Sequence, residues 1–295
     1  MNTQTPLPPG SLRQIVPSEA ELNTIATILH EAAGIVIAPG KTSMVQSRLA
    51  KRLRALQLND YASYIALVRS SEGVAERREM ISALTTNVTH FFREKHHFDT
   101  LRTNALPPLI ARARAGGRVR IWSAGSSNGQ EAYTIAMVLA ELAPDFDRLD
   151  IRILASDIDP LMIARGRSGI YPETAIEPIP TDLQRKYFSA CDAGAEVIAP
   201  LRKLVSFKEL NLHNPWPMSG KFDVIFCRNV VIYFDPPAQA KLWQRFENQL
   251  APGGWLFLGH SERITPVPGS QLTSAGVTTY RLPESGPKSG DTTWP

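Results

Sequence analysis

From Val119 onward the chain alternates short apolar segments with amphipathic helices, and this rhythm restricts the fold more than any other feature. Strands that alternate with helices typically build a parallel sheet covered by helices on both faces. The rhythm therefore predicts a doubly wound α/β domain. The expected strands are 119–123, 151–156, 222–227 and 254–258, and the expected helices are 129–142, 159–167 and 236–250.

The residues before this domain follow a helical period. Apolar side chains recur at helical spacing over 17–101, which predicts a small all-α domain there. Ser18 is expected to start one helix and the pair Asn59-Asp60 to cap the next, since short polar side chains cap helix N-termini. Residues 102–117, which contain a Pro-Pro and a Gly-Gly pair, are expected to link the two domains.

The second domain, 118–282, is expected to carry an insertion. Residues 169–208 contain four prolines and two short β-prone stretches, which indicates a small β-subdomain. Residues 1–16 and 283–295 are rich in Pro, Ser, Gly and Thr and have few apolar anchors, so both are expected to be disordered tails.

Composition excludes several classes of protein. No apolar run approaches the roughly 18–20 residues that span a bilayer, and the first residues contain no signal segment. These features indicate a cytoplasmic protein that does not insert into a membrane. Cys191 and Cys227 have no second cysteine or histidine at metal-ligand spacing, so neither a disulfide framework nor a metal site is expected.

The positive charge lies toward the N-terminus, where residues 1–116 hold 14 Lys and Arg against 9 Asp and Glu. The helix expected at 41–58 contains no acidic residue. The basic side chains on one flank of this helix, beside its leucine stripe, are Lys41, Arg48, Lys51 and Arg52. The flank is either a solvated surface or a docking surface for an acidic partner.

The first expected strand runs into a glycine-containing turn and then a helix, in the sequence IWSAGSSNGQE. Gly125 permits close approach of a ligand to the backbone, and open α/β sheets bind nucleotide-like ligands at such turns. The turn has neither a Walker signature nor G-x-G-x-x-G, which argues against phosphate recognition. A plain tight turn is the alternative.

Polar residues follow two further strands. Asp157 ends the second expected strand, where a carboxylate can accept both ribose hydroxyls of an adenosine or can simply cap the next helix. Arg228 and Asn229 follow the strand at 222–227 and should emerge at the same edge of the sheet. The alternatives are that Asn229 caps the following helix and that Tyr233 belongs to the core. Together with the glycine turn, Asp157 predicts an adenosine site.

Five segments stand in a family-specific order: TTNVTHFFRE at 85–94, the turn at 122–133, ASDID at 155–159, CRNVVIYF at 227–234 and LGHSE at 258–262. They resemble the chemotaxis-receptor glutamate O-methyltransferase (CheR) family over about 85–282. The resemblance implies a class I, Rossmann-like S-adenosylmethionine methyltransferase domain with an inserted antiparallel β-subdomain. It also implies an all-α domain in front.

The activity implied by the resemblance is methyl transfer from S-adenosylmethionine to glutamates of chemoreceptor signalling domains, with S-adenosylhomocysteine as product. Arg93 and Tyr233 would lie near the transferred methyl group. Gly125 of the glycine turn is expected to approach the cofactor. The other implied cofactor contacts are Asn87, Thr89, Arg93, Glu131, Asp157, Asn211, Leu212, Arg228 and Asn229.

The chemistry agrees with the absence of any recognisable triad. A glutamate carboxylate, with an ordinary pKa near ~4.3, is ionised at neutral pH and needs no general base. The enzyme must instead align the carboxylate with the sulfonium methyl group, which can be worth ~7–11 kcal/mol. Arg93 could hold the substrate carboxylate by a bidentate contact, or hold the carboxylate of the cofactor.

Docking on the receptor is expected through Arg48, Lys51 and Arg52 and through the β-subdomain, by a monomeric protein. Segment 189–204 is shorter than in relatives that grip a receptor's C-terminal pentapeptide, which predicts pentapeptide-independent docking. One alternative is a nucleic-acid methyltransferase, but aromatic residues are not interleaved with the basic cluster, so no nucleic acid is expected as partner. The other is a binding module that uses adenosylmethionine as a signal.

Overall fold

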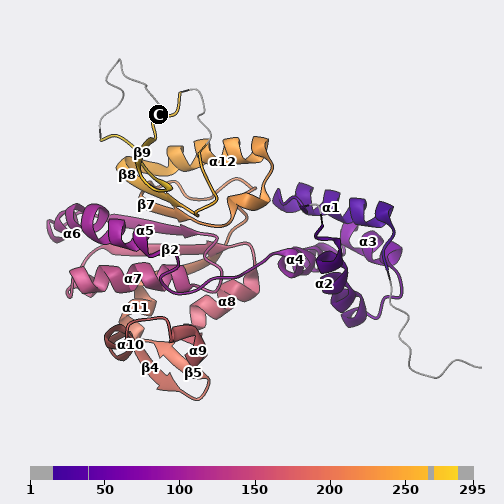
Figure 1. Ribbon diagram of the computed structural model, residues 1–295, viewed down its shortest axis with the longest axis horizontal. Coiled ribbons are helices and arrows are strands. Elements are labelled where there is room, and N and C mark those ends of the chain that lie inside the picture. Colours follow the sequence, from indigo (N-terminus) through magenta and orange to yellow (C-terminus); the bar gives the residue numbers. More distant parts are fainter. Residues whose placement is uncertain (1–15, 39, 265–268, 285–295) are drawn as a thin grey trace, which may run out of the picture. The chain divides into compact units, whose positions relative to one another are not determined.

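The computed structural model describes residues 16–38, 40–264 and 269–284 (Figure 1). Its contacts divide the chain into two compact units. The first holds the segment up to Glu31 together with Ile37–Leu84, and the second holds Ala32–Val36 and everything from Thr85. The expected tails lie almost wholly outside the described residues. Within the described ranges, no helix is both long and apolar enough to cross a membrane.

Over its described residues, the first unit is built of four helices: α1 (Glu19–Ala33), α2 (Thr42–Ala55), α3 (Tyr61–Arg69) and α4 (Val74–Leu84). Both expected helix starts are confirmed. Ser18 and Glu21 bond reciprocally at the start of α1, and Asp60 accepts the Ser63 N–H at 2.7 Å at the start of α3. The apolar stripe predicted for α2 forms part of the core through Val45, Leu49 and Leu53.

A seven-stranded sheet in the order β6-β2-β1-β7-β8-β10-β9 organises the second unit. Its strands are β1 (Val119–Ala124), β2 (Ile151–Asp157), β6 (Val205–Glu209), β7 (Phe222–Cys227), β8 (Leu250–Leu258), β9 (Thr273–Gly276) and β10 (Thr279–Arg281). The first five strands of the order are parallel, and β10 and β9 complete the sheet antiparallel. The strand order reverses between β1 and β7, which is where doubly wound sheets bind their ligands.

Alternate residues of the central strands feed two hydrophobic cores. Ile121 and Phe226 pack in one core, and Trp122 and Ile225 pack in the other. Helix α12 (Pro236–Gln249) covers the second core, and α5 (Lys95–Thr100), α6 (Leu106–Arg114), α7 (Gln130–Leu142) and α8 (Pro160–Ser168) lie with the first (Figure 1). Burial on both faces explains why the strands read as nearly continuous apolar runs.

The smaller sheet has the order β3-β5-β4 and is antiparallel throughout. Its strands are β3 (Ile170–Tyr171), β4 (Phe188–Cys191) and β5 (Gly194–Val197), accompanied by α9 (Glu173–Ile176), α10 (Thr181–Tyr187) and α11 (Ala199–Leu204). The last stretch of the expected insertion behaves differently. Val205–Glu209 forms β6, which pairs in parallel with β2 at the edge of the large sheet.

Two expected boundaries also differ from the structure. The division between the units falls between Leu84 and Thr85 rather than near residue 101, because Phe91, Phe98 and Leu101 are buried in the core of the second unit. The stretch expected as a linker is mostly helix. Short η1 (Leu101–Ala105) leads into α6, whose Pro-Pro pair stands in its first turn, where proline costs no hydrogen bond.

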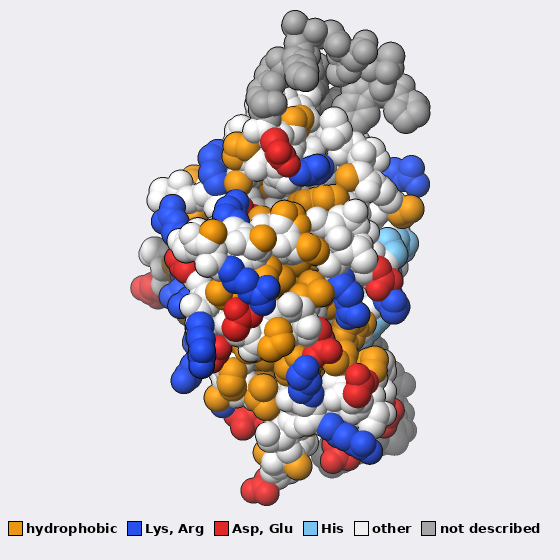
Figure 2. All heavy atoms as spheres, turned by 90° about the vertical axis from the view of Figure 1, so that its left-hand side faces the viewer, with side chains coloured by type: hydrophobic (Ala, Val, Ile, Leu, Met, Phe, Trp, Pro, Cys, Tyr) orange, Lys and Arg blue, Asp and Glu red, His pale blue; other side chains and the backbone are white. Residues whose placement is uncertain are grey.

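Acidic and basic side chains are interspersed on the face of the second unit that carries α6 (Figure 2). Three arginines near the amino ends of the strands each have an acidic partner. The pairs are Arg112 with Asp223 at 2.5 Å, Arg114 with Asp145 at 2.6 Å and Arg120 with Asp150 at 2.9 Å. The positive charge of these three arginines is therefore balanced by neighbouring carboxylates.

Candidate functional site

The turn after β1 passes very close to the loop after β7. Gly125 adopts φ +76° and donates its N–H to the Ser156 carbonyl oxygen at 2.8 Å. A Cβ atom at Gly125 would lie 2.3 Å from Cγ2 of Val230, so only glycine fits both the backbone conformation and the available space. The glycine expected from the sequence thus brings two strand ends together.

Asp157 at the end of β2 organises this turn. Its Oδ2 accepts the Ser127 N–H at 2.7 Å, and its Oδ1 accepts the Asp159 N–H at 2.9 Å. Burial raises the pKa of Asp157 to about 6, although these two backbone N–H groups favour the ionised form. The carboxylate is therefore charged at neutral pH and able to accept further hydrogen bonds.

Asn87 joins the segment before α5 to the same corner. Its Nδ2 donates to Asp159 Oδ2 at 2.8 Å, and its carbonyl accepts the Ser127 hydroxyl at 3.1 Å. Asp159 also caps α8 by accepting the Leu161 N–H. Asp159 thus takes the role of helix cap, which leaves Asp157 at the sheet edge. Thr89 lies two residues beyond Asn87 in the same segment.

Arg228 directly follows β7 and lies between two carboxylates. Its Nη1 lies 3.2 Å from Glu131 Oε2 and its Nη2 lies 3.4 Å from Glu94 Oε2, while Nη2 also donates to the Arg93 carbonyl oxygen. Burial raises the pKa of Glu131, and Arg228 and the Ser123 hydroxyl oppose that rise. Burial would also raise the pKa of Glu94, but Arg228 and the neighbouring His260 outweigh it and lower the pKa.

The loop that follows Arg228 is held by a single buried carboxylate. Glu262 is 3% exposed and accepts hydrogen bonds from five backbone N–H groups. The donors are Asn229, Val230, Val231, Ile232 and Gly259. Glu262 thereby fixes Asn229, which has φ 60°, and the start of η3 (Val231–Tyr233).

The segment after β6 passes the end of β2, because Leu210 donates its N–H to the Asp157 carbonyl at 2.8 Å. Asn211 follows, but its amide is already used locally. Nδ2 donates to the Ala32 carbonyl at 2.7 Å, and Oδ1 accepts the His213 N–H at 2.9 Å. Leu212 is buried, and its carbonyl accepts from Arg245 at 2.6 Å.

The glycine turn retains polar atoms that suit a polar ligand. Ser126 Oγ and Asn128 Oδ1 are buried, and neither has a hydrogen-bond partner within the described chain. With the Asp157 carboxylate beside them, these atoms fit the hydroxyl-rich part of a nucleoside.

The chain matches two protein-family models. Residues 87–280 match "CheR methyltransferase, SAM binding domain" and residues 20–85 match "CheR methyltransferase, all-alpha domain". The chain belongs to the CheR methyltransferase family. It is thus an S-adenosylmethionine-dependent methyltransferase, and S-adenosylmethionine is its cofactor. The models meet at 85–87, in agreement with the division of the two units.

Relatives match over almost their whole length. "Probable chemotaxis protein methyltransferase" of Rhizobium etli is 48% identical, and the match covers 88% of this chain and 98% of the relative. Chemotaxis protein methyltransferase 2 of Pseudomonas aeruginosa is 40% identical, and the match covers 95% of this chain and 99% of the relative. The Escherichia coli chemotaxis protein methyltransferase is 38% identical, and the match covers 90% of this chain and 91% of the relative.

The two residues implied near the methyl group in this CheR chain lie on different segments. Arg93 is partly exposed, and its Nη1 donates to the Val88 carbonyl at 2.9 Å. Tyr233 ends η3, four residues after Asn229, and is partly buried. Arg93 is joined to the site through Arg228, and Tyr233 through the loop that Glu262 holds.

The basic flank of α2 is less free than its sequence suggests. Arg52 forms a bidentate pair with Glu76 of α4, at 3.0 and 2.6 Å, and lies 3.1 Å from Glu79. Arg48 Nη1 donates to the Ala83 carbonyl at 3.2 Å. Lys51 is exposed. Neutralisation comes from α4, which inspection of a single helix cannot reveal.

Two site residues were missed in the sequence. Glu94 and Glu262 stand within recognised motifs, but the sequence predicts no role for either. Their roles depend on partners far along the chain, since Glu94 meets Arg228 and Glu262 meets the loop at 229–232. The available signal was that each acid is the only acidic residue of its motif, FFRE or LGHSE.

Proposed function

We propose that this CheR methyltransferase converts glutamate side chains of chemoreceptor signalling domains to methyl esters, with S-adenosylhomocysteine as the second product. The observation that carries the proposal is the convergence of Asn87, Gly125, Asp157 and Arg228 at one edge of the sheet, where the strand order reverses. The names of the relatives, chemotaxis protein methyltransferases, support a chemotaxis substrate.

The chemistry needs little from the protein beyond placement. S-adenosylmethionine supplies a methyl group on a positively charged sulfur. A carboxylate oxygen forms the new bond to carbon as the carbon–sulfur bond breaks and its electron pair stays on sulfur, so no proton is transferred. The glutamate is ionised at neutral pH, so the residues must only bind, orient and exclude water.

Arg93 is the proposed anchor for the substrate carboxylate. One of its guanidinium nitrogens is held by the Val88 carbonyl, which fixes the side chain and leaves other N–H groups for a planar carboxylate. Tyr233 is proposed to border the methyl group from the opposite loop. Asn87, Thr89, Glu131, Asp157, Asn211, Leu212, Arg228 and Asn229 are proposed to contact the cofactor, with Gly125 giving it room.

Receptor docking is proposed for the exposed part of the α2 flank, centred on Lys51, and for the β-subdomain. Arg52 is better assigned to holding α4, given its bidentate pair with Glu76. The β4–β5 hairpin turns between Cys191 and Gly194, and this short turn supports docking without a C-terminal pentapeptide. We further propose that the protein acts as a cytoplasmic monomer and binds no nucleic acid.

The decisive experiment is incubation with methyl-labelled S-adenosylmethionine and a purified receptor signalling domain. We expect label on the receptor that mild alkali releases as methanol, and none after every glutamate of the candidate helices is changed to alanine. Alkali-stable label, or label on added RNA, would contradict the proposal. A pentapeptide titration that shows tight, sequence-specific binding would contradict the docking mode alone.

Docking can be tested separately from chemistry. Lys51→Glu should weaken receptor methylation and leave S-adenosylhomocysteine affinity unchanged, because α2 belongs to the helical unit. Lys221→Glu, a charge reversal in the second unit just before β7, is the matched control. Equal losses in the two variants would remove α2 as a docking surface.

A further inference from the structure

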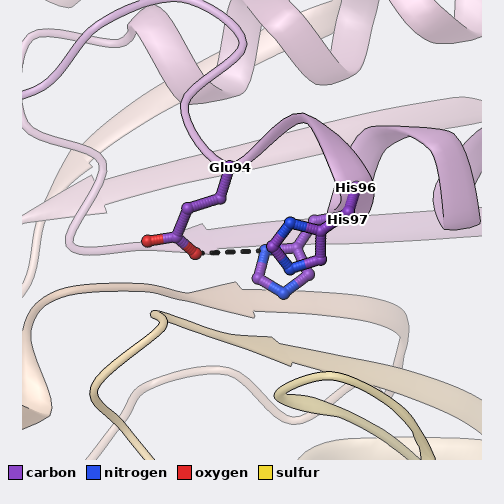
Figure 3. A group of neighbouring side chains, drawn as sticks. All are labelled: Glu94, His96 and His97. Atoms are coloured by element: carbon purple, nitrogen blue, oxygen red, sulfur yellow. Dashed lines mark ion pairs between the residues drawn. The ribbon is translucent and has the colours of Figure 1, made fainter.

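Three of the six histidines of the chain gather around the Glu94 carboxylate. His97 Nδ1 lies 3.4 Å from Glu94 Oε2, and His260 Nδ1 lies 3.1 Å from Glu94 Oε1. The His96 ring lies beside that of His97, with centroids 4.1 Å apart (Figure 3). His97 and His260 reach this carboxylate from segments more than 160 residues apart, so the cluster is a product of the fold.

The hydrogen bonds of His97 fix which of its nitrogens carries the proton. Nε2 lies 3.3 Å from the Val277 carbonyl oxygen and 3.0 Å from Thr278 Oγ1. A carbonyl oxygen can only accept, so in the neutral ring Nε2 is assigned the hydrogen and Nδ1 presents its lone pair to Glu94. In the described structure, Nδ1 and Glu94 Oε2 are both buried without a hydrogen-bond partner. Two facing electron-pair donors are a feature of metal sites.

The spacing of the donors suits a tetrahedral ion. Zinc binds nitrogen and oxygen at about 2.0–2.2 Å, which places neighbouring ligand atoms about 3.3–3.6 Å apart. The 3.4 Å between His97 Nδ1 and Glu94 Oε2 has this value. One donor atom from each of Glu94, His96 and His97 lies within 4.8 Å of the others, and exposed His96 can rotate to close the remaining gap.

We infer that Glu94, His96 and His97 form a binding site for a divalent transition-metal ion of the zinc class. Exposed His260, which already contacts Glu94, can supply a fourth ligand. Two imidazoles and a carboxylate favour such ions over Mg²⁺ or Ca²⁺, which prefer oxygen ligands alone. The cysteines play no part, so the spacing of cysteines along the sequence could not indicate this site.

The nearby Arg228 lies close enough to the proposed metal site to be affected by it. Arg228 faces two carboxylates, Glu94 and Glu131, so one negative charge is left to offset part of the charge of the metal ion. The metal would bind Glu94 Oε2, the oxygen that lies 3.4 Å from Arg228 Nη2. Metal binding therefore competes with that contact and, where Arg228 holds the cofactor as proposed above, lowers cofactor affinity.

Zinc binding can be measured without any methyl transfer. Tag-free protein is titrated with ZnCl₂ in competition with a chromogenic chelator, and we expect one ion per chain. His96→Ala should weaken binding about tenfold or more, because it removes an exposed ligand without opening the core. His90→Ala, another exposed histidine of the same segment, is the matched control and should bind as the wild type does. Excess MgCl₂ should not compete.

Absence of stoichiometric binding, or equal zinc affinity in His96→Ala and the wild type, overturns the site. Effective competition by MgCl₂ overturns the ligand class. The coupling is measured by calorimetry of S-adenosylhomocysteine with and without saturating zinc, where we expect about fivefold weaker binding in the wild type and no change in His96→Ala. Equal affinities in the wild type would reject the coupling. Neither result depends on which substrate is methylated.

Discussion

Each unit of the protein contains one arginine between two glutamates, and the two arrangements differ in how completely they are hydrogen-bonded. In the helical unit, Arg52 grips Glu76 with two nitrogens, and the Tyr64 hydroxyl donates to the same carboxylate at 2.9 Å. In the methyltransferase unit, Arg228 meets Glu131 and Glu94 at 3.2 and 3.4 Å, with one contact to each.

The difference shows that the Arg52 network is fully hydrogen-bonded within the protein, whereas the Arg228 network is not. Arg228 Nε and Glu94 Oε2 are buried and lack hydrogen-bond partners in the part of the chain that is described. A buried polar atom without a partner costs free energy, and a site that binds a ligand can recover that cost on binding. The Arg52 network therefore contributes stability, whereas the Arg228 network has unused capacity at the predicted cofactor site.

The largest expected effect comes from breaking the incomplete network. Arg228→Met should weaken S-adenosylhomocysteine binding at least about 100-fold, because each hydrogen bond from the charged guanidinium to the cofactor contributes about 1.5–3 kcal/mol. Calorimetry measures the affinity, and circular dichroism verifies the fold. Arg112→Met, which loses an ion pair at the other end of the sheet, is the control. If Arg228→Met does not fold, Arg228→Lys keeps the charge and should still lose at least tenfold. Affinity within threefold of wild type in the folded variant would contradict the assignment.

Breaking the Arg52 network should reduce stability and leave cofactor affinity intact. Arg52→Met is expected to lower the free energy of unfolding of the helical unit by roughly 2–3 kcal/mol, less than for a fully buried pair because 24% of the Arg52 side chain is exposed. Cofactor affinity should stay unchanged. Urea unfolding followed by circular dichroism measures the first quantity. Arg54→Met, on the exposed face of the same helix, is the control and should leave the free energy of unfolding and the cofactor affinity unaltered. A loss of cofactor affinity in Arg52→Met would contradict the contrast between the two units.

Caps and central strands could be predicted from the sequence. Local signals were sufficient for caps and strands: Ser18 and Asp60 start helices as expected, and Asp157 ends β2. These features depend on side chains that bond within a few residues. Periodicity likewise located the central strands, because burial on both faces requires apolar runs.

Features that depend on distant pairing were not predictable. β6 reads like any short β-prone stretch, and only its pairing with β2 places it in the large sheet. β9 and β10 are short and largely polar, and they were not expected at all. The neutralisation of Arg52 by α4 and the loop-holding role of Glu262 require contacts between segments 24 and about 30 residues apart.

A smaller effect on the same site should appear with pH. Burial raises the pKa of Asp157 to about 6, so the carboxylate is protonated as the pH falls through 6. Hydroxyl donors of a bound nucleoside favour the ionised form, so S-adenosylhomocysteine affinity should be constant above about pH 7 and fall about tenfold per unit below 6. The stability of the free protein should change with pH in the opposite direction. Because the pKa of Asp157 is higher in the folded protein than the value near 3.8 of the unfolded chain, its ionisation lowers the free energy of unfolding as the pH rises from 4 to 6. Asp157→Asn should flatten the affinity profile between pH 5 and 7, and an unchanged profile would exclude Asp157 as the titrating group.

The smallest effect tests whether Asn87 holds the glycine turn after β1 in place for binding, as Arg52 holds α4 in the helical unit. Asn87 bonds Asp159 at 2.8 Å and accepts from Ser127 through its carbonyl, so only the first contact is lost in Asn87→Ala. One neutral-to-charged hydrogen bond should change S-adenosylhomocysteine affinity by about 1–2 kcal/mol, or roughly 5- to 30-fold, if Asn87 contacts or orders the nucleoside pocket. Asn104→Ala, an exposed change in η1, is the matched control. A loss of thermal stability without loss of affinity would place Asn87 with Arg52, as a residue that holds the fold and takes no part in binding.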